Sequence, residues 1–250
     1  MLKHVLIIIS LLFSPPLLAD VGVLFTKDYW LNNTSTKKQA IDKAKAPIVR
    51  DFMKMCLKPS SSQRFTLDAI VKSHFSYTLK GVTNAKKICE TISERYIEDS
   101  EYSSILLNGE KITDITPLQY LVQVDELSLR NNHINDISPL SKLVNLKDIS
   151  LGNNPIKDIS SLEKLKQLER LSLYNDNLID ISPLGRIKSL KSLSLSSNNK
   201  NKEVLRNLTN LETLFIDGVT DNICVVSELT NLKSLYLSHT GTKDISCLSP

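Results

Sequence analysis

A repeat of 22 residues constrains this chain more than any other feature of its sequence. Apolar residues recur in the pattern L-x-x-L-x-L, and its copies begin at Tyr102, Val124, Leu146, Leu168, Leu190, Leu211 and Leu232. The first four intervals are 22 residues long and the last two are 21 residues long. Self-similarity at a fixed period of this length indicates a solenoid, in which each repeat buries its apolar face only against its neighbours.

The spacing inside each copy predicts a short strand. The last two leucines flank one residue, as Leu127 and Leu129 flank Ser128. Because alternate side chains of a strand point to opposite faces, both leucines point inward and the residue between them points outward. Successive coils should therefore stack their strands about 4.8 Å apart into a parallel sheet.

An amide recurs three residues after the last leucine, where the chain leaves the sheet. Such a side chain both donates and accepts hydrogen bonds, so it suits turns whose backbone groups would otherwise be buried without partners. Asn132, Asn154 and Asn198 occupy this position, and Asp176 is a partial substitute. We interpret this set as a structural asparagine ladder.

The second half of each repeat carries a shared D-I-S/T-P-L motif, beginning at Asp114, Asp136, Asp158 and Asp180, with Ser161 in place of proline in the third copy. Asp followed by Ser or Thr and Pro favours a tight turn that enters a short 3₁₀ segment. The period leaves too few residues for a full α-helix. A narrow convex side should therefore back a sheet on the concave side.

These two motifs together resemble the internalin class of bacterial leucine-rich repeat proteins, over residues 102–250. The resemblance implies a helical cap before the solenoid and a concave face that binds a partner protein, often on a host cell, in a host-interaction or virulence role. Nothing here resembles the family's immunoglobulin-like C-terminal cap or its wall-anchoring tail. The last two repeats carry Val219 and Thr240 at the asparagine position, so the ladder is expected to weaken there.

Residues 20–101 lack the repeat and have a helical pattern that suits such a cap, because an open solenoid needs its end coil covered. We expect one helix from a capping box at Thr36 that Pro47 interrupts, a loop over residues 58–62, and further helices over residues 67–78 and 83–96. The predicted fold is α/β: a leucine-rich repeat solenoid of about seven coils behind an N-terminal all-α cap.

Residues 1–19 have the layout of a secretory signal. Lys3 precedes the apolar run from Val5 to Phe13, and cleavage is expected after Ala19. The run is shorter than the about 20 residues that a membrane span requires. The sequence therefore predicts an exported protein, secreted or periplasmic, with no membrane span.

The four cysteines, Cys56, Cys89, Cys224 and Cys247, favour two disulfides, because the count is even and the protein is predicted to be exported. Local pairing is the simplest of the three connectivities. Cys56 and Cys89 fall on two predicted helices of the cap. Cys224 falls at the Ser position of its D-I-S-P-L equivalent and Cys247 at the Pro position one coil later. Adjacent coils place such positions within disulfide reach, so this pair should lock the final coil.

A catalytic or metal site is not expected. The chain has no H-E-x-x-H, C-x-x-C, G-x-S-x-G or phosphate-loop motif, and we predict neither a cofactor nor enzymatic activity. His74 beside Cys56 or Cys89 is interpreted as a histidine near a structural disulfide rather than a thiol–imidazole pair. The net charge of +4 is small and both signs are interspersed, which disfavours a nucleic-acid partner.

The outward positions of the predicted sheet are dominated by serine, with aromatic exceptions. Phe215 and Tyr236 lie on consecutive coils and Tyr174 lies two coils earlier. Aromatic residues presented on a rigid sheet are favoured interface anchors. We predict that these three residues bind a protein partner, and that a charged rim sets specificity. The rim consists of Glu126, Arg130, Asp148 and Arg170.

Two other hypotheses remain open from the sequence. The helical residues 20–101 would carry the function, as an enzyme inhibitor or effector, with the solenoid as scaffold. Alternatively, the concave aromatic residues would bind carbohydrate.

Overall fold

The structure is a computed structural model that describes residues 34–75, 78–79, 82–98, 103–174, 178, 180–196, 200–217, 223–238 and 246–248. The chain divides into two compact units, residues 1–51 and 52–250. The predicted signal, Asp176, Asn198, Val219 and Thr240 lie outside the described residues. The predicted boundary between cap and solenoid at residue 101 stays a prediction.

The first described helix, α3, runs without a break from Thr34 to Leu57 and includes Pro47. The expectation that Pro47 interrupts this helix is therefore wrong. Proline removes one backbone donor and disfavours the helix locally, but the hydrogen bonds on either side remain. Alanine and lysine residues precede Pro47 and are strong helix formers, which favours continuation.

Two further helices precede the solenoid: α4 from Ser61 to His74 and α5 from Ala85 to Ser93, which continues into a π-helical segment over Glu94–Glu98. The start of α4 corrects the expected loop over residues 58–62. The Ser60 hydroxyl accepts from the Gln63 N–H while the Gln63 side chain accepts from the Ser60 N–H. This reciprocal capping box begins the helix at the residue after Ser60.

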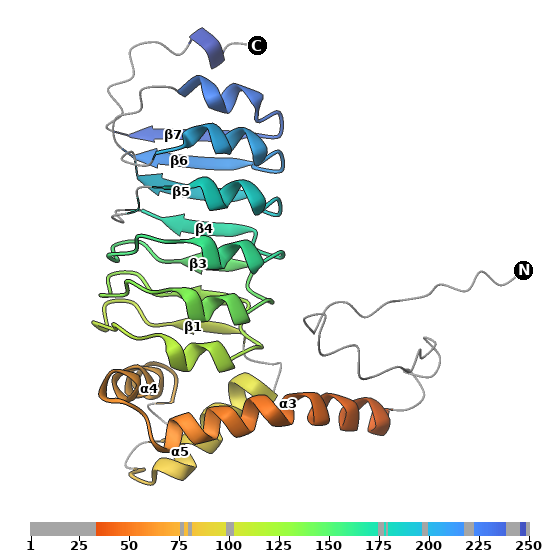
Figure 1. The fold of residues 1–250 in the computed structure, drawn as a ribbon, viewed down its shortest axis with the longest axis vertical. Coiled ribbons are helices and arrows are strands. Elements are labelled where there is room, and N and C mark those ends of the chain that lie inside the picture. The colour runs from red at the N-terminus through yellow and green to blue at the C-terminus, as the bar shows by residue number, and fades with distance from the viewer. Residues whose placement is uncertain are drawn as a thin grey trace, which may run out of the picture. The chain divides into compact units, whose positions relative to one another are not determined.

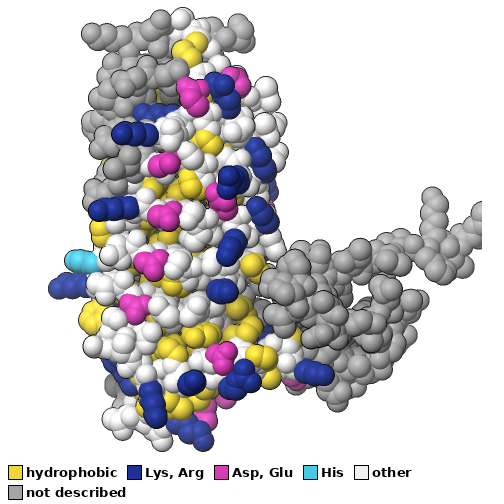
Figure 2. Space-filling view, in the orientation of Figure 1, with side chains coloured by type: hydrophobic (Ala, Val, Ile, Leu, Met, Phe, Trp, Pro, Cys, Tyr) yellow, Lys and Arg dark blue, Asp and Glu magenta, His cyan; other side chains and the backbone are white. Residues whose placement is uncertain are grey.

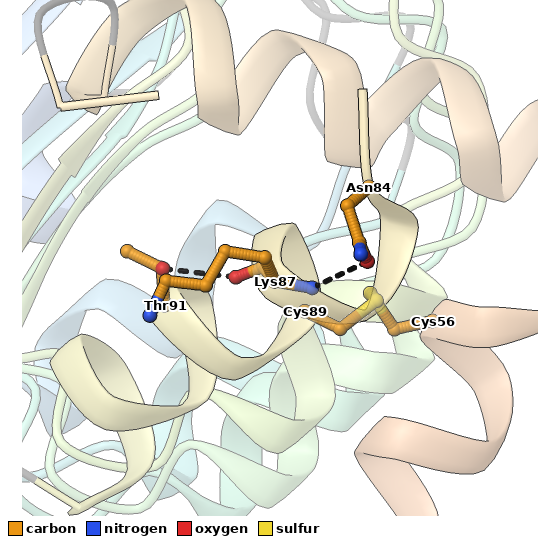
Figure 3. The surroundings of a disulfide bond; sticks show 5 residues. All are labelled: Cys56, Asn84, Lys87, Cys89 and Thr91. Atoms are coloured by element: carbon orange, nitrogen blue, oxygen red, sulfur yellow. Dashed lines mark hydrogen bonds between the residues drawn. A yellow bond between two sulfur atoms is a disulfide. The ribbon is translucent and has the colours of Figure 1, made fainter. Parts of the chain in front are cut away.

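A disulfide joins the end of α3 to α5. Cys56 and Cys89 are buried and bonded, with their Cα atoms 5.9 Å apart (Figure 3). The Asn84 side chain accepts from the Lys87 N–H and caps α5 next to this bond. Phe52, Ile70 and Ile92 are fully buried within the same unit. The helical segments of this unit, from Phe52 onward, form the cap of the solenoid.

Seven strands form one parallel sheet, in the same order as in the sequence (Figure 1). They are β1 Ser104–Leu106, β2 Glu126–Ser128, β3 Asp148–Ser150, β4 Arg170–Leu173, β5 Ser192–Ser196, β6 Thr213–Asp217 and β7 Ser234–Ser238. Short 3₁₀ helices run along the other side: Thr116–Tyr120, Ser138–Lys142, Ser160–Lys164, Ser182–Arg186, Lys202–Asn207, Ile223–Glu228 and Ser246–Leu248. The fold is the predicted leucine-rich repeat solenoid with a helical cap.

The repeated leucines and isoleucines fill the space between the sheet and the 3₁₀ segments. Leu127, Ile149 and Leu151 are fully or almost fully buried, as are their equivalents through β6. In β7 the corresponding Leu235 and Leu237 are only half-buried. The core is therefore thinnest at the last described coils, where Cys224 and Cys247 form the second disulfide.

Asn132 and Asn154 are buried where the chain leaves β2 and β3. The Asn132 amide donates to the Leu107 and Leu129 carbonyls and accepts from the Ile112 N–H, so it joins two coils. Asn131 and Asn153, which precede the two ladder residues, adopt positive φ angles of 57° and 61°. Asparagine tolerates this left-handed conformation, which explains why the asparagines come in pairs.

The D-I-S/T-P-L motif has a single local function. Asp136 Oδ1 accepts from the Ser138 N–H at 2.8 Å, immediately before a 3₁₀ segment. The same bond, also at 2.8 Å, recurs at Asp114, Asp158 and Asp180. Each aspartate therefore fixes the turn that leads into the convex side.

Candidate binding face

The outward positions of the strands form columns that run across the sheet, because neighbouring strands pair in register. The central column consists of Leu106, Ser128, Ser150, Ser172, Ser194, Phe215 and Tyr236. Four serines thus separate one exposed leucine from two aromatic residues. We call this outward side of β1–β7 the concave face.

Phe215 and Tyr236 lie side by side on β6 and β7. Their rings stack with centroids 4.3 Å apart and planes only 6° from parallel. Nevertheless, 40% of Phe215 and 52% of Tyr236 remain exposed. The pair therefore presents a rigid apolar surface to solvent, since each ring holds the other in place.

Tyr174 belongs to a different column. It follows the last residue of β4 and is 38% exposed. A Cβ atom at position 152 of the preceding coil would lie 2.8 Å from the Tyr174 carbonyl oxygen, so only glycine fits at that position. Tyr174 is thus placed on the same side of the sheet as the stacked pair but apart from it.

The charged rim contains one close ion pair. Arg170 Nε donates to Asp148 Oδ2 at 2.6 Å, across β4 and β3. This hydrogen bond, together with the charge of Asp148, raises the pKa of Arg170. Arg130 donates to the Ser150 hydroxyl at 3.1 Å, and Glu126 lies beside Asp148 in the sheet register. Two of the four predicted rim residues are therefore paired with each other.

A hollow of about 530 Å³ lies over the concave face. The serines of the central column are part of its lining, and Leu106 and Phe215 lie at its two ends along the column. Glu126, Arg130, Asp148 and Arg170 also line it. The structure thus brings all four rim residues and Phe215 into one depression, while Tyr174 and Tyr236 lie outside its lining.

Leu106 was missed by the reasoning from sequence. It is 50% exposed and occupies the same column as Phe215 and Tyr236. The signal was available, because writing the repeats in register places a leucine where four later coils have serine. Attention to aromatic residues alone passed over it.

A second missed feature is a column of alternating charge at the entrance to the strands. Lys147 pairs with Asp125 at 3.4 Å, Lys191 with Glu169 at 2.9 Å, and Lys233 with Glu212 at 2.8 Å. Acidic and basic side chains are also interspersed on the face shown in Figure 2. This pattern neutralises charge between coils instead of forming a patch of one sign.

Both disulfides have the local pairing, so no cysteine thiol is present beside His74. Within the described parts of the chain, no group of three His, Cys, Asp or Glu residues is placed to hold a metal ion. None of the helices in these parts is long and apolar enough to cross a membrane.

Comparison with known proteins points to one class. The family described as "Leucine Rich repeats (2 copies)" matches residues 122–164. The structure of an internalin (inlF) from Listeria monocytogenes is similar with a TM-score of 0.58 and 30% sequence identity, covering 73% of this chain and 52% of that chain. The chain thus spans about half of the length of that internalin.

A second internalin from Listeria monocytogenes, internalin C2, shares the fold. It has a TM-score of 0.52 and 23% identity, covering 74% of this chain and 88% of that chain. No curated protein sequence matches the chain. The repeat motif, the seven-stranded parallel sheet, the helical cap and these similarities lead to one conclusion: the chain is an internalin-like leucine-rich repeat protein.

Proposed function

We propose that this protein recognises another protein through its concave face, with Phe215 and Tyr236 as the principal anchors and Tyr174 as an outlying one. The observation that carries the proposal is the stacked, half-exposed aromatic pair at one end of a serine-lined face. Large rigid aromatic side chains lose little conformational entropy on binding and dominate the energetics of many interfaces.

The rest of the face supports a protein partner. The four serines keep the surface wet and flat, while the Arg170–Asp148 pair and the neighbouring Glu126 and Arg130 provide charges that a partner must match. Charged groups at the edge of an interface contribute mainly to specificity and association rate. Recognition would then combine an apolar anchor at β6–β7 with charge matching at β2–β4.

The stacking of the two rings bears on the carbohydrate hypothesis. A sugar ring binds by lying on an open aromatic face. Phe215 and Tyr236 each use one face for the other. The ring edges and the outer faces stay available to a partner, so carbohydrate binding is kept as an outcome of the experiment below.

We further propose that the protein is exported and acts in the periplasm or outside the cell, where it would meet a host-cell surface protein. Both disulfides support export, because disulfides persist in oxidising compartments. Cleavage after Ala19 is part of this proposal, and N-terminal sequencing of the mature protein tests it directly.

The experiment is affinity capture with the full mature protein from host-cell surface and periplasmic extracts. The double variant Phe215→Ala/Tyr236→Ala is compared with Phe65→Ala, which removes an exposed aromatic residue from α4. We expect the wild type and Phe65→Ala to capture a partner protein that the double variant does not capture. If the double variant captures that partner and Phe65→Ala does not, recognition belongs to the cap instead. Release by free sugars would indicate a lectin.

A further inference from the structure

Strand β1 is the edge of the sheet next to the cap. Among the described residues it pairs only with β2, and the Leu107 N–H donates to the Ser128 carbonyl of that strand. Successive N–H groups of a strand point to opposite sides, so the Leu106 N–H points away from β2. An unpaired edge of this kind is normally covered by another element.

A histidine side chain covers this edge. His74, the last residue of α4, places its Nε2 atom 3.2 Å from the Leu106 nitrogen and accepts its N–H. The ring also meets Tyr96 edge to face, with centroids 6.0 Å apart. His74 thereby connects the cap to the strand that carries Leu106 into the hollow of the concave face.

This bond requires a neutral imidazole. A nitrogen that accepts an N–H has no proton of its own, whereas both ring nitrogens carry protons in the charged form. Protonation of Nε2 would therefore place two N–H donors, that of His74 and that of Leu106, in opposition, with their nitrogens 3.2 Å apart. Histidine is the side chain whose charge ordinarily changes between about pH 5 and 8.

The surroundings also oppose the charged form. Burial lowers the pKa of His74 from its ordinary value of 6.5, and the charge of Arg95 lowers it further. Arg95 donates to the His74 carbonyl from the π-helical segment. Lys72 of α4 and Glu110 of the first coil pair with each other at 2.8 Å. No described carboxylate is hydrogen-bonded or ion-paired with the ring to stabilise its charge.

We propose that His74 is a pH-sensitive latch that holds β1 to the cap at neutral pH and releases it on acidification. The Leu106 end of the concave face would then loosen while the stacked pair on β6 and β7 stays in place. Any effect on recognition rests on the function proposed above. The latch itself does not, because it is measured without a partner.

The sign of the effect follows from linkage. The folded protein binds the His74 proton less well than the unfolded chain does, so acidification below pH 6.5 favours opening. The contribution of the latch is fully present above 6.5 and is lost as the pH falls from there to the lowered pKa of the folded state. Each pH unit in this window weakens the latch about tenfold.

The test is amide hydrogen exchange of the full mature protein at about pH 7.5 and about pH 5, corrected for the intrinsic pH dependence of exchange. We expect protection of the Leu106 amide to fall at the lower pH, by at most about 30-fold, which is the limit set by the pH units between 6.5 and the lower pH. In His74→Gln the side-chain oxygen accepts the N–H at either pH, so protection should not change. His133→Gln, which removes an exposed histidine from the solenoid, should behave as the wild type.

A second measurement needs no variant: the titration midpoint of the His74 ring, followed by NMR, should coincide with that of the Leu106 amide shift and lie below 6.5. Protection of Leu106 that is equal at both pH values in the wild type would overturn the latch. The latch would also be overturned if His74→Gln lost as much Leu106 protection on acidification as the wild type does. Different titration midpoints for the His74 ring and the Leu106 amide shift would overturn it as well. Loss of partner binding in Phe215→Ala/Tyr236→Ala, by contrast, bears only on the proposed function.

Discussion

The Asn154 side-chain nitrogen lies 2.9 Å from the carbonyl oxygen of Leu129, a residue of the preceding coil. Asn154 also donates to the Leu151 carbonyl and accepts from the Ile134 N–H, all in the protein interior. Asn154→Ala should lower the free energy of unfolding by about 2–3 kcal/mol, because it leaves buried backbone groups without partners. Denaturant unfolding measures this change.

Asn210→Ala is the matched control for this prediction. Asn210 also donates to a carbonyl of the preceding coil, that of Lys188, but the bond is exposed to solvent. Water replaces the lost amide there, so the change should stay within about 0.5 kcal/mol. If both variants lost the same free energy of unfolding, burial would not be what makes the ladder asparagines stabilising.

The Cys224–Cys247 bond joins the last two described 3₁₀ segments. In Cys224→Ser/Cys247→Ser we expect faster hydrogen exchange in β7 and unchanged exchange in β2 and β3, because coils of a solenoid contact only their neighbours. Cys56→Ser/Cys89→Ser should instead accelerate exchange in α5. A uniform change across all strands would contradict this local role.

Lys233 holds the pKa of Glu212 below its ordinary value, mainly through their hydrogen bond. A carboxyl with a lowered folded-state pKa contributes stability above its unfolded pKa, and this contribution is lost as the pH falls through the lowered value. Lys233→Gln should therefore raise the pKa of Glu212 toward 4.5 in an NMR titration. Lys142→Gln, in an earlier coil, should leave it unchanged. An unaltered pKa in Lys233→Gln would show that the pair does not form in solution.

Glu126 is proposed to act on the association rate rather than on the lifetime of a complex. In Glu126→Gln the association rate constant should change several-fold at low salt, and the difference should shrink at high salt as the charge is screened. Surface plasmon resonance at two ionic strengths measures this. Glu203→Gln, which changes a residue of the convex side, should have the association rate constant of the wild type. If Glu126→Gln changed only the dissociation rate constant, Glu126 would not act as a rim residue.

The solenoid could be predicted from the sequence because its period fixes the register. Once Val124 and Leu146 are aligned, every inward and outward position follows, and so does the proximity of Cys224 and Cys247. The aspartate turns and the asparagine ladder were predictable for the same reason, because each depends on backbone geometry that repeats from coil to coil.

Features that depend on side-chain rotamers or on the cap were not predicted. The stacking of Phe215 on Tyr236 requires a particular ring orientation, and the Arg170–Asp148 bond requires one arginine rotamer among many. The His74–Leu106 contact depends on how α4 packs on the first coil, which no repeat specifies. The predicted interruption at Pro47 was wrong because the helical preference of the surrounding residues outweighed the local cost of proline.

The affinity of the captured partner for Phe215→Ala/Tyr236→Ala, measured beside the wild type and Phe65→Ala, tests the concave-face account most directly. Loss of the two aromatic anchors should weaken binding at least about 30-fold, since each is expected to contribute about 1 kcal/mol or more. Phe65→Ala should bind as the wild type does. A dissociation constant that the double variant leaves unchanged, in a protein that still unfolds as the wild type does, would contradict recognition through this face.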